Sequence, residues 1–95
     1  MRIQAEEQQA ITEAIAKFDR EASVYLFGSR VDDAKKGGDI DILVISDKID
    51  KGSLYLIEEE VFKRIEEQKI DFVLTGTDLN NQFAKMILKK GVVRL

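Results

Sequence analysis

The sequence contains no cysteine and no histidine. Without cysteine, disulfides and thiolate metal sites are excluded. Without histidine, any general base must be a carboxylate, a lysine or water, and any metal site must be built from oxygen ligands. Oxygen ligands favour magnesium or manganese over zinc. The residue types that are lacking therefore restrict metal chemistry in this chain to hard divalent cations.

Long apolar runs and an excess of positive charge are also lacking. No apolar run approaches the length of a membrane span and no signal-peptide pattern opens the chain, so we expect a cytoplasmic protein. The formal net charge of −3 argues against broad electrostatic binding to nucleic acid. At 95 residues, the chain predicts one domain over residues 1–95, with a core sufficient to fold and no room for a second lobe.

Two apolar runs flank a glycine-serine turn. Residues 24–27 predict a short strand, which breaks at Gly28. Residues 40–45 are rich in β-branched side chains and predict a second strand, opened by a pair of glycines. The connection is predicted as a short helical turn over 29–34 and a polar loop over 35–38. Because this connection is short, the two strands are expected to be antiparallel neighbours.

Two carboxylates stand at the start of the second predicted strand. Asp39 and Asp41 are two residues apart, so they project to the same face of the sheet. Side by side at the mouth of an apolar strand they repel each other, and a divalent metal ion offsets that repulsion best. The simpler alternative is a chance placement of two aspartates at a strand start, and the pair alone does not exclude it.

The glycine-serine turn favours the metal interpretation. Gly28 permits a turn that other residues resist, and Ser29 opens a turn of helix whose free N–H groups can hold phosphate oxygens. The antiparallel pairing returns Asp39 close to both. A phosphate cradle beside a carboxylate pair is typical of a metal ion that bridges a nucleoside triphosphate to the protein.

A third carboxylate joins the pair if the sheet has the expected topology. Residues 53–68 predict an amphipathic helix capped by Ser53, and residues 70–74 predict a third strand. A strand–helix–strand unit of this length normally makes a right-handed crossover between parallel strands. That crossover brings Asp71 near the first two aspartates. The alternative is that Asp71 is only an edge residue in an apolar strand.

Two further helices complete the predicted fold. Residues 2–19 have apolar side chains at helical spacing, and the last helix is expected to start at Thr77 or Asp78 and to end at Gly91. Residues 92–95 predict a short edge strand or an apolar tail. The fold class is a small α/β domain ordered α-β-α-β-α-β-α, with a mixed three-stranded sheet in the order one-two-three. The side chains of the last helix expected to face the core are Leu79, Phe83, Met86 and Ile87.

The turn and the carboxylate pair together resemble a known family signature. Residues 28–30 (Gly-Ser-Arg) and 38–44 (Gly-Asp-Ile-Asp-Ile-Leu-Val) resemble the nucleotidyltransferase signature of the DNA polymerase β superfamily. More closely, the chain is similar to the minimal nucleotidyltransferases that are paired with HEPN-domain proteins in prokaryotic toxin–antitoxin modules. The resemblance covers nearly the whole chain. Two positions depart from it: Asp33 stands where the family often has glycine, and Gly38 where it often has serine.

The resemblance implies a catalytic metal site. Asp39, Asp41 and Asp71 would hold two magnesium ions, with manganese as a substitute, and Asp71 would help to activate the attacking hydroxyl. It also implies a nucleotide site: Gly28 and Ser29 would hold the β- and γ-phosphates. Arg30 either adds positive charge there or is an ordinary solvated arginine.

The implied reaction is transfer of a nucleotide, AMP from ATP, to an acceptor hydroxyl. The acceptor would lie on a HEPN-domain toxin, and the chain would be its antitoxin. Two alternatives stay open. The chain is either a catalytically weak nucleotide-binding antitoxin that neutralises its partner by binding, or a nucleotide-sensing regulatory module.

Overall fold

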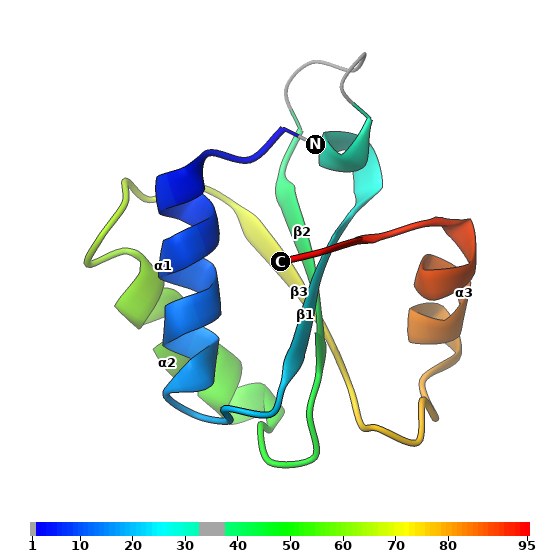
Figure 1. Ribbon diagram of the computed structural model, residues 1–95. Coiled ribbons are helices and arrows are strands. Elements are labelled where there is room, and N and C mark those ends of the chain that lie inside the picture. The colour runs from blue at the N-terminus through cyan, green and yellow to red at the C-terminus, as the bar shows by residue number, and fades with distance from the viewer. Residues whose placement is uncertain (1, 33–37) are drawn as a thin grey trace.

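The computed structural model describes residues 2–32 and 38–95. It contains a mixed β-sheet with helices on both faces (Figure 1). A short 3-10 helix, η1 (Gly28–Val31), follows the first strand. The strands are β1 (Ser23–Phe27), β2 (Ile40–Ile45), β3 (Ile70–Thr75) and β4 (Val93–Arg94). The helices are α1 (Ala5–Ala16), α2 (Lys51–Val61) and α3 (Gln82–Lys90). No helix in the described ranges is long and apolar enough to cross a membrane.

The sheet has four strands in the order β3-β2-β1-β4. β1 and β2 are antiparallel, and β2 and β3 are parallel, as predicted. The sheet has four strands and not the predicted three, because residues 92–95 contain the edge strand of the two predicted alternatives, and this strand, β4, pairs antiparallel with β1. This pairing fills the edge of β1 that β2 leaves open, and the Leu95 N–H also donates to the Val24 carbonyl at 2.9 Å.

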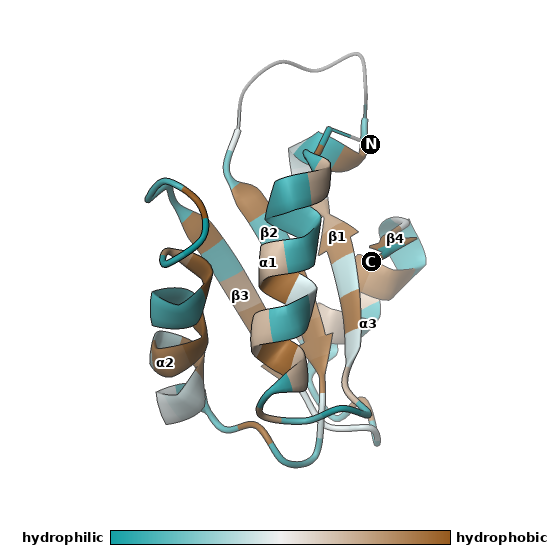
Figure 2. Ribbon diagram, turned by 60° about the vertical axis from the view of Figure 1, so that its left-hand side comes forward, coloured by the Kyte–Doolittle hydropathy of each residue, from teal (hydrophilic) through white to brown (hydrophobic). Residues whose placement is uncertain are grey.

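Side chains alternate between two apolar layers along each strand. Even-numbered residues of β1 and β2 pack with α1 and α2. Odd-numbered residues such as Leu43 pack with α3, which contributes Ala84 and Ile87. Apolar residues dominate the strands in Figure 2 and lie between the helices on either side. Since Asp41 and Asp71 have the parity of Leu43 and Val73, both lie on the α3 face of the sheet.

The starts of α2 and α3 differ from the predicted ones because other residues cap them, whereas α3 ends at Gly91 as predicted. Asp50, not Ser53, caps α2, and its carboxylate accepts the Ser53 N–H at 2.8 Å. Asn81 caps α3 in place of Thr77 or Asp78. Thr77 donates both its N–H and its hydroxyl to the Asp47 carboxylate, so it fastens the loop after β3 to the loop after β2.

The predicted inner face of α3 is also wrong for two side chains. Phe83 and Met86 are 50% and 48% exposed. Ile87 faces the sheet as predicted, and Ala84, one turn before it on the same side of α3, faces the sheet with it. The neighbouring Phe83 and Met86 therefore form an apolar outer surface.

Candidate active site

The parallel pairing of β2 and β3 places Asp41 directly opposite Asp71. The predicted crossover between these strands implied this proximity of Asp71 to Asp41. Burial raises the pKa of Asp41 above its usual value, and the like charges of Asp71 and Asp39, together with a hydrogen bond to Asp71, raise it further. The two strands thus hold carboxylates together against their mutual repulsion.

Asp39 lies one residue before β2 and is turned toward a lysine. Its Oδ2 is 3.6 Å from Lys69 Nζ, in an ion pair that is exposed to solvent. Within residues 2–32 and 38–95, no three acidic side chains are arranged as a ready metal site. Oxygen-only ligands and an unfavourable carboxylate pair fit a hard divalent cation. For Asp39 to join such a site, its carboxylate must exchange Lys69 for the ion.

Gly28 forms the wall against which Asp41 rests. Its φ of +77° lies in the left-handed region that favours glycine. A Cβ at this position would overlap the Oδ2 atom of Asp41. The end of β1 therefore accommodates the carboxylate only because residue 28 has no side chain.

Gly38 makes a similar contact with Ser29. A Cβ on Gly38, whose φ is +88°, would overlap the Ser29 Oγ. The serine that the family often has here would therefore be strained in this backbone. The predicted turn over 29–34 corresponds to η1 as far as Val31, whereas residues 33–37, including Asp33 and most of the predicted loop, lie outside the described residues.

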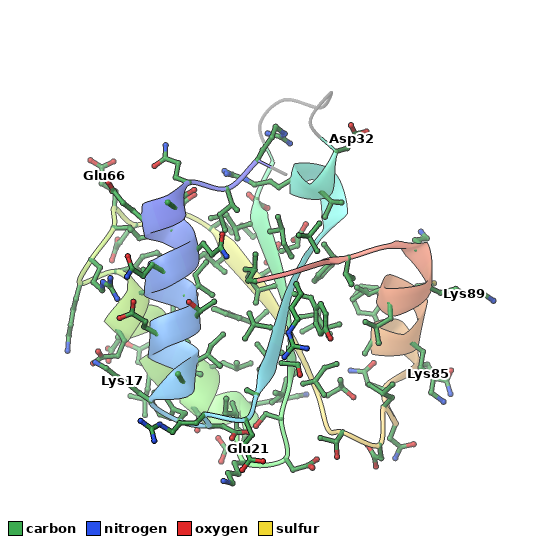
Figure 3. The ribbon with its side chains drawn as sticks, in the orientation of Figure 1. Lys17, Glu21, Asp32, Glu66, Lys85 and Lys89 are labelled. Atoms are coloured by element: carbon green, nitrogen blue, oxygen red, sulfur yellow. The ribbon has the colours of Figure 1, made fainter. Side chains whose placement is uncertain are left out.

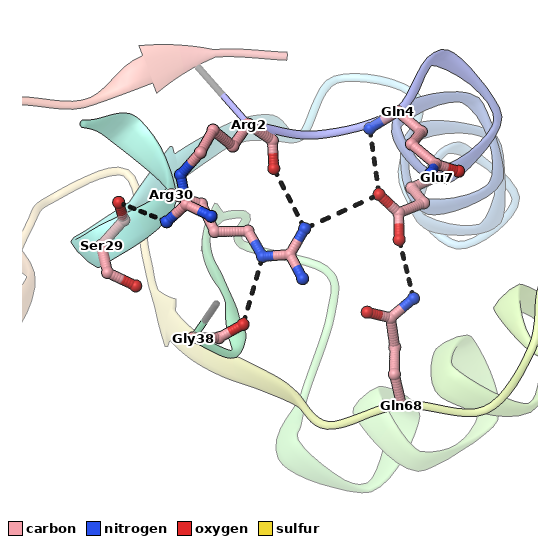
Figure 4. Close-up of polar contacts among 7 residues, drawn as sticks. All are labelled: Arg2, Gln4, Glu7, Ser29, Arg30, Gly38 and Gln68. Carbon is pink, nitrogen blue, oxygen red and sulfur yellow. Dashed lines mark hydrogen bonds and ion pairs between the residues drawn. The ribbon is translucent and has the colours of Figure 1, made fainter. Parts of the chain in front are cut away.

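Arg30 is engaged with the protein itself. Its side chain is 19% exposed, which is not the environment of a fully solvated arginine. Its Nε donates to the Gly38 carbonyl at 3.2 Å, and a terminal nitrogen donates to the Arg2 carbonyl at 3.0 Å (Figure 4). The same nitrogen lies 3.8 Å from a carboxylate oxygen of Glu7.

Glu7 is not among the site residues predicted from the sequence. Its carboxylate accepts the Gln4 N–H at 2.9 Å and the Gln68 side-chain amide at 2.7 Å. The spacing of Gln4 and Glu7 is that of a capping box at the start of α1, and this spacing was the available signal. The contact with Arg30 joins segments far apart in the chain, and no local pattern predicts it.

A family model described as polymerase β nucleotidyltransferase matches residues 9–93. The chain belongs to this nucleotidyltransferase family. Its matched span includes the Gly28–Ser29 turn and all three candidate aspartates. The match takes in nearly the whole of residues 1–95 and places them in the polymerase β superfamily.

A solved structure shares the fold of this nucleotidyltransferase domain. It is described as a "Crystal structure of putative nucleotidyltransferase" and is 23% identical in sequence, with a TM-score of 0.65. The alignment covers 96% of this chain and 99% of that one, so the two have the same extent. Among curated proteins, none matches the sequence.

Proposed function

We propose that the protein is a metal-dependent nucleotidyltransferase that moves AMP from ATP to an acceptor hydroxyl. The observation that carries this proposal is the juxtaposition of Asp41 and Asp71 beside the Gly28 turn. Like charges held together by a sheet destabilise the fold unless a cation joins them, so their placement favours a metal-binding role over a structural one. Membership of the family supports the reaction class.

Each site residue has a role in this reaction. Asp39, Asp41 and Asp71 would hold the magnesium ions. Magnesium, when bound, supplies the positive charge that neutralises the phosphates. The acceptor oxygen attacks the α-phosphorus, its proton passes to Asp71, and the bond to pyrophosphate breaks. The turn at Gly28 and Ser29, to which Arg30 belongs, binds the β- and γ-phosphates.

The acceptor is proposed to be a hydroxyl of a HEPN-domain toxin in the cytoplasm. The outer surface of α3 supports the docking of a partner. Phe83 and Met86 line an open groove there with Gln82, Lys85 and Lys89. Lys85 and Lys89 project outward beside it (Figure 3). An apolar groove with a basic rim fits an amphipathic partner surface that carries acidic residues.

This same surface favours a second candidate function. If docking alone neutralises the partner, the chain is an antitoxin by binding, and transfer of nucleotide is incidental. Phe83 and Lys85 then matter for neutralisation, whereas the aspartates do not.

The deciding experiment combines purified protein, a HEPN-domain partner, ATP and magnesium, and measures the mass of AMP on the partner. The parent and the control Asp78→Asn should transfer AMP, because Asp78 lies in the exposed loop after β3. Asp71→Asn should not transfer, and it should fail to rescue growth when co-expressed with the partner.

Two other outcomes would contradict parts of this proposal. Loss of transfer with full rescue by Asp71→Asn would establish neutralisation by binding, and Phe83→Ser should then abolish it. Undiminished transfer by Asp71→Asn would remove Asp71 from the catalytic residues.

A further inference from the structure

The guanidinium of Arg30 connects the candidate phosphate turn to two other segments, the entry of β2 and the N-terminal segment. One of its nitrogens bonds to the carbonyl of Gly38, the residue that precedes Asp39, and another bonds to the carbonyl of Arg2. Arg30 itself lies in η1, next to Ser29. The side chain therefore ties the turn after β1 to the entry of β2, across the 33–37 segment that separates them in sequence.

Glu7 places a carboxylate oxygen 3.8 Å from this guanidinium. Its side chain has little exposure, 8% for the residue as a whole, and a carboxylate removed from water needs partners. Those partners come from separate segments: Gln4 at the cap of α1, Gln68 before β3, and Arg30. If Arg30 turned toward a phosphate, Glu7 would lose its cationic neighbour, and an uncompensated buried charge is costly.

Arg2 closes the arrangement from the other side. Its backbone N–H donates to the Arg30 carbonyl at 2.7 Å. Its guanidinium donates to the Ser29 carbonyl at 3.0 Å (Figure 4). It also donates to the Asp32 carbonyl at 3.2 Å. The two arginines thus hold the N-terminal segment against η1. The guanidinium of each one donates to main-chain carbonyls of the segment that contains the other.

We propose that Arg30, oriented by Glu7, is a positioning residue that holds the Ser29 turn against Gly38 and so sets the place of Asp39. This inference rests on the proposed nucleotidyl transfer for its purpose, but its geometry does not depend on it. The requirement is for arginine specifically. A planar guanidinium can serve two carbonyls and a carboxylate at once, whereas the point charge of a lysine cannot.

The first test needs neither metal nor nucleotide. The Ile40 N–H, which donates to the Lys69 carbonyl at 3.3 Å, reports on the entry of β2. Glu7→Gln and Arg30→Lys should each speed hydrogen exchange at this amide by about fivefold to tenfold, the scale of one ordinary intramolecular hydrogen bond. The control is Glu13→Gln, which removes an exposed carboxylate on the same helix that pairs with Arg64 at 3.2 Å. Unchanged exchange in both test variants would overturn the proposal.

The second test separates positioning from phosphate contact. If Arg30 positions the turn, the affinity for a non-hydrolysable ATP analogue with magnesium should fall about fivefold to tenfold in Glu7→Gln and in Arg30→Lys. The double variant should lose no more than either single one, because both act through one network. If Arg30 instead binds phosphate directly, Arg30→Lys keeps most of the affinity and Glu7→Gln has no effect, which overturns the proposal.

Failure of the proposed function would be visible separately. If the parent binds no nucleotide, nucleotidyl transfer is excluded, and the exchange of the Ile40 amide alone decides whether Arg30 and Glu7 hold the turn. Thermal unfolding of each variant, read beside Glu13→Gln, checks that the exchange change is local rather than global.

Discussion

Asp41 is the residue at which stability and the proposed function conflict. Because burial and the neighbouring aspartates raise its pKa in the folded state, its ionised form destabilises the fold. Asp41→Asn should therefore stabilise the metal-free protein at neutral pH by about 0.5 kcal/mol, the scale of a cross-strand pair. Chemical denaturation measures this gain, and the exposed Asp78→Asn is the control. A loss of stability in Asp41→Asn would contradict the repulsion.

The pH dependence of that gain has a defined sign. A carboxyl whose folded pKa is raised binds its proton more tightly in the folded than in the unfolded state. The parent therefore recovers stability relative to Asp41→Asn as the pH falls through the raised pKa toward the ordinary value of 3.8. Denaturation of both proteins between neutral pH and pH 4 should show the difference shrinking; a constant difference would exclude titration of Asp41 as its source.

Gly28 offers a test of backbone strain and side-chain overlap together. Gly28→Ala places a Cβ on Asp41 at a φ of +77°, whereas Gly91→Ala meets nothing within 4 Å at a φ of +120°. We expect Gly91→Ala to cost about 1–3 kcal/mol from strain alone, because its φ of 120° and ψ of 132° lie outside the left-handed helical region in a part of backbone space that few residues other than glycine adopt. Gly28→Ala should cost about 2–4 kcal/mol, because overlap adds to strain. Equal losses of unfolding free energy in the two variants would show that the Asp41 side chain moves away from the added Cβ with no loss of stability.

The start of α3 gives a prediction at the scale of an element. The Asn81 side chain accepts the N–H groups of Phe83 at 2.9 Å and Ala84 at 3.2 Å, and it donates to the Leu74 carbonyl. Asn81→Ala should destabilise the protein by about 1 kcal/mol, the usual value of an N-cap. Asn80→Ala is the matched control, since Asn80 is exposed, and it should change stability by less than about 0.5 kcal/mol. Equal losses of stability for Asn81→Ala and Asn80→Ala in thermal unfolding would show that Asn81 is not the N-cap of α3.

The strands could be predicted from sequence, but the starts of α2 and α3 could not. Apolar runs next to glycine mark β1 and β2, and their limits were predicted to within one residue. At the helix starts, several residues of capping type stand in succession. Asp50 precedes Ser53, and Thr77 and Asp78 precede Asn81. Which of these residues caps the helix depends on which of them is needed for contacts between loops. Tertiary contacts such as that of Thr77 with Asp47 make this choice.

At the scale of the molecule, the site was predictable where chain topology alone determines it. The crossover through α2 fixes β3 parallel to β2, and this register sets Asp71 opposite Asp41. The network of Glu7 and Arg30 was not predictable, because it joins α1 to η1 through side chains and carbonyls with no shared local pattern. The pairing of β4 depends likewise on an open edge that only the assembled sheet displays.

Metal binding and folding should be linked in this protein, and Asp41 should reverse the order of stabilities. Without metal, Asp41→Asn is expected to melt above the parent, since it removes the repulsion with Asp71. A ligand that binds only the folded state adds about 2.7 kcal/mol at a concentration a hundred times its Kd. For a domain of this size, about 1 kcal/mol corresponds to roughly 4–8 °C in Tm. With saturating magnesium, the parent should therefore melt above Asp41→Asn.

Thermal unfolding of both proteins across a magnesium series measures this reversal. Sodium chloride at matched ionic strength controls for screening, which relieves carboxylate repulsion without occupying a site. Asp78→Asn should follow the parent throughout, because its carboxylate lies away from the Asp41–Asp71 pair. A parent Tm that rises equally in sodium and magnesium would mean that the pair is only screened, and the aspartates would then not be a metal site. A rise in Tm that is specific to magnesium and is lost in Asp41→Asn would show that the ion binds at the carboxylates that repel each other in the metal-free protein.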